Sequence, residues 1–347
     1  MAVGVLRRWA AMAPVPVFVA RGGGAGSRPA ELAADPRLRL VATPRHASVL
    51  LAAGRFPAAM GAALDRLHDQ LPAPRAVVWW TPDTSAERPA ALRDATVVSE
   101  ADPADAVVAA HRAVLVGALA SSPGVLADVP PNEFAGRGDH GQGGEGMMGG
   151  VPYGRPMAMT ADDRDGLSLD RLPVTLGPFL PGFPNGLQAN VTLQGSVVQE
   201  LSLAVLDLGD GASLDDLDAD LDDDVVTTPR LRLRWLADAL RLGGLHALAA
   251  RAARAARQGS SPATLSSAVR RSGLPQAWAG IGVIDGVDAR ARLLRTLEPD
   301  ESGAERPSVG LDRLSSALVG SDWADAVAAI ASFDLATDGA DRQGARR

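Results

Sequence analysis

Short apolar runs and helical repeats alternate in the first third of the chain. Residues 38–42, 46–54, 75–80 and 95–98 have the apolar character of strands, and residues 56–71 and 104–120 have helical spacing. In the first of these helices Met60, Leu64 and Leu67 recur at helical intervals. Pro72 ends that repeat. Strands and helices at these intervals predict an α/β domain with an open parallel sheet over residues 36–130.

Residues 1–35 do not continue this pattern. Two arginines precede a short apolar run to Ala20, which is the arrangement of a secretory signal peptide. However, Pro14 and Pro16 interrupt the run, and no small-residue cleavage site follows it. Residues 21–35 are rich in glycine, serine, proline and alanine, and are predicted to form a loop. We therefore expect a cytoplasmic protein whose N-terminal extension, residues 1–35, lies against a partner.

The pattern changes in the second half of the chain. Residues 172–176 are a predicted short strand, and residues 187–193 and 197–205 are two strands joined at Gln194-Gly195-Ser196, which indicates a hairpin. Helical patterns follow over residues 230–257, 262–271, 287–297, 311–318 and 323–332. Gly243-Gly244 is expected to kink or divide the first of them. These elements predict an α+β domain over 167–338, followed by a polar tail at 339–347.

A glycine-rich stretch over residues 131–166 separates the two patterns. So many glycines indicate a linker or a loop with unusual backbone geometry. Loops of this composition can cradle phosphate, but a phosphate-binding loop needs a lysine, and the chain contains none. A dinucleotide site would need a strand before the glycines and a helix after them, and neither is evident. We interpret the stretch as a hinge. Of the chain's dispersed histidines, only His140 lies within it.

Composition excludes several classes of function. The net charge of −7 gives no general attraction for nucleic acid. The chain has no cysteine, so disulfides, thiolate zinc sites and cysteine-ligated iron–sulfur clusters are excluded. The aspartate-rich run over residues 207–224 does not match the spacing of a calcium-binding EF-hand, and is interpreted as a solvated insertion. His68, beside Asp69 on a predicted helix, is expected at the surface or in a helix cap.

The first half resembles the B-type subunit of respiratory complex I, a family shared with the small subunit of membrane-bound nickel–iron hydrogenases. The resemblance is carried by Thr43–Gly54 and by Ala63–Arg75, whose end reads like the family's "D-Q-x-P-x-P-R" run. In the family, cysteines after this run and further upstream hold the terminal iron–sulfur cluster. The matching places here are Trp80–Asp83 and Arg21–Gly24, which contain no cysteine.

The second half resembles the D-type subunit of complex I, the relative of the hydrogenase large subunit. Leu176–Pro181 is similar to the family's "G-P-x-H-P" element, followed by a strand–glycine–strand unit over Leu193–Glu200. The position of the family's quinone-site histidine is Leu180 here. Near the C-terminus, Leu318–Asp334 resembles the large-subunit ending "G-x-x-x-A-D-A-x-x-x-x-A-S-x-D", and the metal-binding cysteines that follow it in hydrogenases are replaced by Leu335–Asp338.

Together the resemblances imply a fused and shortened module of the B-type and D-type families, with no metal and no other cofactor. They favour a non-catalytic scaffold or docking subunit, peripheral on the inner face of the cell membrane, bound to antiporter-like or complex I-like membrane subunits. Two alternatives stay open: a working NADH-quinone oxidoreductase-type subunit that binds quinone or a nucleotide, and a soluble protein that binds a small ligand. The candidate ligand-binding residues are His140, Tyr153, Arg155, Gly177 and Pro178. No catalytic residue is predicted.

Overall fold

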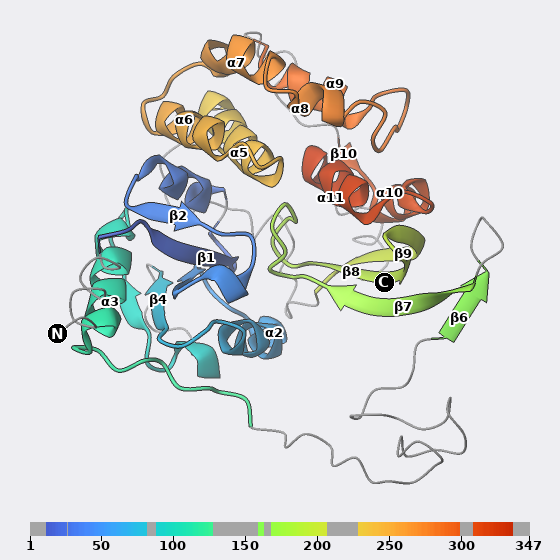
Figure 1. Ribbon diagram of the computed structural model, residues 1–347. Coiled ribbons are helices and arrows are strands. Elements are labelled where there is room, and N and C mark those ends of the chain that lie inside the picture. Colours follow the sequence, from blue (N-terminus) through green and yellow to red (C-terminus); the bar gives the residue numbers. More distant parts are fainter. Residues whose placement is uncertain are drawn as a thin grey trace, which may run out of the picture.

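The first half of the chain forms a five-stranded sheet in which every strand pair is parallel. The computed structural model describes residues 12–25, 27–81, 88–127, 159–162, 168–206, 228–298 and 308–335 (Figure 1). The strands are β1 (Val15–Arg21), β2 (Leu38–Leu40), β3 (Val49–Ala53), β4 (Ala76–Trp80) and β5 (Thr96–Val98). Their order in the sheet is β2-β1-β3-β4-β5. From β1 the chain adds β2 on one side and then β3, β4 and β5 on the other, so the strand order reverses between β1 and β3, as in doubly wound α/β folds.

Two helices cover the opposite faces of this sheet. The inner strands β3 and β4 are buried along their whole length, as expected for continuous apolar runs between two helical layers. Alternate strand residues point to each face. Leu51 and Val78 pack in one apolar cluster with α3 (Ala104–Val116), whereas Leu50 and Trp79 pack in another with α2 (Ala58–Asp69). Two short 3-10 turns, η2 (Pro44–His46) and η3 (Ala90–Leu92), complete the connections. The predicted α/β class is confirmed.

The apolar run before residue 21 is a strand between two neighbours, which corrects the expected extension over 1–35. β1 pairs with β2 and β3, and Val17 is fully buried. The expected loop at 21–35 is likewise corrected, because η1 (Arg28–Ala34) is a 3-10 helix with buried Pro29, Ala30, Glu31 and Leu32. The sequence pattern missed both elements because prolines interrupt the apolar run and glycines follow it.

The second half contains a four-stranded antiparallel sheet in the order β6-β7-β8-β9. The strands are β6 (Met159–Asp162), β7 (Ser168–Leu176), β8 (Leu187–Gln194) and β9 (Val197–Val205). The predicted hairpin is confirmed as β8–β9. β6 lies inside the expected hinge at 131–166, so the second sheet begins earlier than predicted. One face of this sheet packs on α10 (Leu311–Leu318) and α11 (Trp323–Ser332), which Figure 1 draws in red.

Two long helices connect the second sheet to the first. α5 (Thr228–Leu242) and α6 (His246–Arg257) are separated at Gly243-Gly244, which confirms the predicted division. They pack on η1 of the first half through Ala30. On their other side lie η5 (Pro262–Leu265), α7 (Ser266–Arg270), α8 (Leu274–Ala277) and α9 (Ala289–Arg295) (Figure 1). A short parallel pair, β10 (Ser308–Val309) and β11 (Asp334–Leu335), follows. The α+β class of the second half is thereby confirmed.

Candidate functional site at the junction of the two halves

Two of the five predicted site residues lie where the halves meet. Gly177 and Pro178 follow β7 at the start of the loop that leads to β8. Gly177 has a φ of 99°, and a Cβ there would lie 2.3 Å from the carbonyl oxygen of Leu187, so no side chain fits. His140, Tyr153 and Arg155 lie outside the described residues. The structure therefore brings together only the Gly177-Pro178 part of the predicted site.

A small cavity lies between this loop and the first sheet. We call it the junction cavity. Its volume is about 40 Å³. Phe18, Val19, Arg21, Leu40 and Val41 line it from the first half, and Pro178 to Phe183, Asn185 and Arg241 line it from the second. This volume suits a few water-sized occupants, whereas pockets for drug-sized ligands are roughly 300–1,000 Å³.

The place of the family's quinone-site histidine is therefore part of an apolar wall. Leu180 lines the junction cavity together with Phe179 and Phe183. Phe179 also packs on Phe56 of the first half, with ring centroids 6.0 Å apart. The side chains that close this wall are hydrocarbon, and they provide neither a proton donor nor a metal ligand.

Charged side chains of α5 join the two halves next to this cavity. Arg230, Arg234, Asp238 and Arg241 follow one another at intervals of four, four and three residues, so they share one face of the helix. That face is directed at β1 and η1. Arg21 at the end of β1 is 2.5 Å from Asp238, and Arg241 is 2.8 Å from the other oxygen of the same carboxylate.

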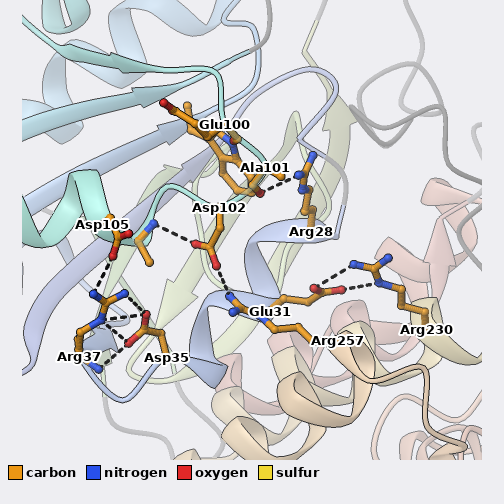
Figure 2. Close-up of polar contacts among 12 residues, drawn as sticks. Arg28, Glu31, Asp35, Arg37, Glu100, Ala101, Asp102, Asp105, Arg230 and Arg257 are labelled. Carbon is orange, nitrogen blue, oxygen red and sulfur yellow. Dashed lines mark hydrogen bonds and ion pairs between the residues drawn. The ribbon is translucent and has the colours of Figure 1, made fainter.

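Glu31 of η1 is the second anionic centre of the junction. Its carboxylate accepts hydrogen bonds from Arg230 Nε and Nη2 at 2.8 and 3.1 Å, which Figure 2 shows, and from Arg234 Nε at 2.6 Å. Burial alone would raise the pKa of Glu31, but the hydrogen bonds from the two arginines outweigh it and hold the pKa below its ordinary value. Glu31 is therefore an ionised carboxylate inside the protein.

A more exposed ion pair extends the junction to α6. Arg257 lies 3.0 Å from Asp102, in the loop before α3 (Figure 2). In the same loop the carbonyl oxygen of Ala101 accepts a hydrogen bond from Arg28, whose guanidinium lies over the Trp80 ring. Both halves thus contribute cations and anions to one continuous polar layer.

The carboxyl edge of the first sheet is closed by backbone hydrogen bonds. Gly23 and Arg55 donate to each other's carbonyl oxygens, at 2.7 and 2.8 Å. Gly54 donates to Trp80 at 2.8 Å, and its own carbonyl oxygen accepts from the Trp79 indole. Of the two places where the resemblance implies cysteines, the described residues Trp80, Thr81 and Arg21–Gly24 lie at this edge, and they do not fit an iron–sulfur cluster. Among the described residues, no three histidines, cysteines or carboxylates could hold a metal ion.

His68 belongs to a buried polar contact that sequence reasoning missed. Its side chain is fully buried, which corrects the expected surface or cap position. Nδ1 lies 2.7 Å from Asp69 Oδ1, and Nε2 lies 2.9 Å from the Ser122 hydroxyl. Burial lowers the pKa of His68 below its ordinary value despite the Asp69 carboxylate. Both ring nitrogens have partners, and this is why the imidazole can be buried.

Asp69, His68 and Ser122 contact one another in the same order as the carboxylate, histidine and serine of a serine hydrolase. Their surroundings, however, indicate a structural role, in which they hold the segment after α3 in place. Asp69 also accepts the backbone N–H groups of Val125 and Leu126, at 3.0 and 2.8 Å. The backbone N–H of Ser122 donates to the carbonyl oxygen of Arg75, and Arg75 Nε donates to the carbonyl oxygen of Ser122. The contacts therefore tie the segment after α3 to the end of α2, and they turn the serine hydroxyl toward a fully buried ring.

Comparison of the chain with protein-family models, with curated proteins and with solved structures gives no significant match. No helix in the described part of the chain is long and apolar enough to cross a membrane.

Proposed function

We propose that this protein is a metal-free docking subunit of a complex I-like membrane complex and carries out no redox chemistry of its own. In this proposal it is peripheral on the inner face of the cell membrane and binds antiporter-type membrane subunits. The B-type-like half and the D-type-like half supply the docking surface as one body. Electrons do not pass through it, because a chain without cysteine cannot hold the thiolate-ligated clusters of the family.

The observation that carries the proposal is the packed junction. The loop after Gly177 lies against β1 and β2. Phe179 of this loop packs against the apolar cluster that contains Leu50 and Leu64, so the segments that resemble the two complex I families share one core. In place of an open ligand pocket, this contact contains a cavity of about 40 Å³ and the ion pairs of Glu31 and Asp238. A junction fixed in this way supports a scaffold role, for which the two halves must keep one relative position.

The test is purification of the tagged full chain from detergent-solubilised membranes of its native cell. We expect antiporter-type or complex I-like membrane subunits in the eluate, and no stoichiometric iron or nickel in the chain isolated from them. Stoichiometric iron or nickel would overturn the proposal.

One observation favours a second candidate, a subunit that binds quinone. Pro178 and Leu180 line the junction cavity at the place where the resemblance implies a quinone headgroup. A quinone ring would require Phe179 and the loop around it to move away from β1. A soluble quinone analogue that raises the unfolding temperature of the native chain, and fails to do so in Leu180→Trp, would favour this candidate over the scaffold.

A further inference from the structure

The helices after α5 concentrate the positive charge of an otherwise acidic chain. The net charge of the whole chain is −7, yet no aspartate or glutamate lies between Asp238 and Asp285. The same interval contains six arginines, namely Arg241, Arg251, Arg254, Arg257, Arg270 and Arg271. All of these except Arg241 are exposed, on α6 and at the end of α7. The surface of these two helices is therefore basic, although the chain as a whole is acidic.

Three of these arginines form the exposed face of α6, and we call them the α6 arginine row. Arg251, Arg254 and Arg257 follow one another at intervals of three residues, so they lie along one side of the helix, about 4.5 Å apart along its axis. The opposite side consists of buried alanines that pack on α5 and η1. His246 and Ala247 are the other exposed residues of α6. The exposed face therefore contains no anion and no large apolar side chain.

Most of the charge in this row has no counter-charge inside the protein. Arg251 and Arg254 have no ion-pair partner in the described part of the chain, whereas Arg257 lies 3.0 Å from Asp102. The two arginines at the end of α7 contact serine hydroxyl groups, which are neutral. Like charges on neighbouring helical turns repel one another. An external anionic surface would therefore stabilise the row.

We propose that the α6 arginine row lies on anionic phospholipid headgroups and sets the orientation of the chain at the membrane. This inference rests on the proposed function, which places the chain at the inner face of the membrane, where anionic lipids create a negative surface potential. Each arginine near such a surface strengthens binding about fivefold. Because the exposed face has no large apolar side chain, the helix lies on the headgroups without inserting, and salt weakens the contact.

The small number of unpaired arginines favours a membrane over a nucleic acid. A nucleic acid would have to be bound by this row alone, and three arginines offer it few phosphate contacts. At a membrane the partner subunit supplies the main affinity, so the row has only to orient a chain that is already held there. The face that meets the headgroups is then the side of α6 opposite its buried alanines.

The experiment is cosedimentation of the purified full chain with vesicles of equal parts phosphatidylglycerol and phosphatidylcholine, and with vesicles of phosphatidylcholine alone. The salt concentration is about 0.1 M, where a Debye length of about 10 Å screens the more distant acidic residues. We expect binding to the anionic vesicles only, and its loss at about 1 M salt. A native chain that stays in solution with both kinds of vesicle, as it would if its own aspartate-rich run at 207–224 neutralised the row, overturns the proposal.

Two double variants of equal charge change make the test specific. Arg251→Gln with Arg254→Gln should weaken binding to the anionic vesicles roughly 25-fold, because each arginine contributes about fivefold. Arg66→Gln with Arg93→Gln, at exposed positions of the first half, is the matched control and should leave binding unchanged. None of the four side chains has an ion-pair partner in the part of the chain that the structure describes, so both variants should keep the native unfolding temperature.

Equal weakening by the two double variants would overturn the proposal, because net charge alone would then govern binding. A DNA duplex that binds the native chain and is lost in the α6 variant, while vesicle binding is kept, would overturn it in favour of a nucleic acid. The vesicles contain no protein, so a failure here is distinct from a failure of the proposed function, which the recovery of membrane subunits tests.

Discussion

Arg234 donates a 2.6 Å hydrogen bond to Glu31 across 203 residues of sequence, and both side chains are almost fully buried. Without Arg234 the buried Glu31 carboxylate keeps Arg230 as a partner but loses one charged hydrogen bond, so we expect Arg234→Leu to lower the free energy of unfolding by about 1.5–3 kcal/mol. The exposed pair Arg313–Asp285 is the matched control, and Arg313→Leu should cost less than about 1 kcal/mol. Urea unfolding of both variants measures the difference. Equal, small losses would contradict the account.

The stability of the junction should depend on acid pH. Glu31 and Asp238 have pKa values below their ordinary ones, so the folded chain binds fewer protons than the unfolded chain near those values. Their stabilisation is complete above the ordinary carboxylate pKa, and it is lost as the pH falls from about 5 through the folded pKa values. Urea unfolding between pH 7 and 3 measures this loss. It should be smaller in Glu31→Gln than in the native chain, and an unchanged slope would count against the ionised state of Glu31.

His68→Gln and Ser122→Ala test the Asp69–His68–Ser122 contacts, which hold the segment after α3 against the end of α2. Each leaves a buried polar group without its partner, and we expect each to cost about 1–3 kcal/mol of unfolding free energy. Amide hydrogen exchange at Val125 and Leu126 should become faster in His68→Gln. His246→Gln, an exposed histidine at the start of α6, is the control and should be neutral. Phosphorylation of Ser122 by a serine-directed organophosphate, with loss of the reagent's leaving group, would contradict the structural interpretation.

Gly177→Ala tests the entry of the loop that forms the junction. Two factors oppose a side chain at Gly177: its φ is positive, and an added Cβ would lie 2.3 Å from the carbonyl oxygen of Leu187. Gly195, in the β8–β9 turn, has a φ of 61° and nothing within 4 Å of an added Cβ. Gly195→Ala should therefore cost only the conformational term, about 1–2 kcal/mol, and Gly177→Ala should cost at least ~1 kcal/mol more. Thermal or urea unfolding compares them, and similar losses would mean that the loop adapts freely.

Sequence reasoning predicted the elements whose apolar pattern is local. Buried strands such as β3 and β4 are continuous apolar runs, and α5 and α6 are divided at the glycine pair that marks the break. β1 was missed because of Pro16. The Pro16 carbonyl oxygen accepts a hydrogen bond from the Ser48 N–H group, just before β1 and β3 begin to pair at Val17 and Val49. Because proline lacks an N–H group, it is tolerated at this position, where the β1–β3 pairing has not yet begun.

The candidate site was predictable only in part, because its interactions join distant segments. Gly177 and Pro178 were found through a resemblance, and Pro178 lines the junction cavity. Glu31 and Arg234 have no sequence signal as a pair. The signal that was available is the spacing of Arg230, Arg234, Asp238 and Arg241, which places these four charged residues of α5 on one helix face. A charged face on a buried helix requires partners, and Arg21 of β1 and Glu31 of η1 provide those that lie outside α5.

The central claim is that this two-part chain docks on a membrane complex. The most direct measurement is quantitative mass spectrometry of the tagged full chain, purified from detergent-solubilised native membranes. The account predicts antiporter-type or complex I-like membrane subunits at a fixed ratio to the chain, with no stoichiometric iron or nickel bound to it. Recovery of the chain without any such membrane subunit, or with stoichiometric iron or nickel, would contradict it.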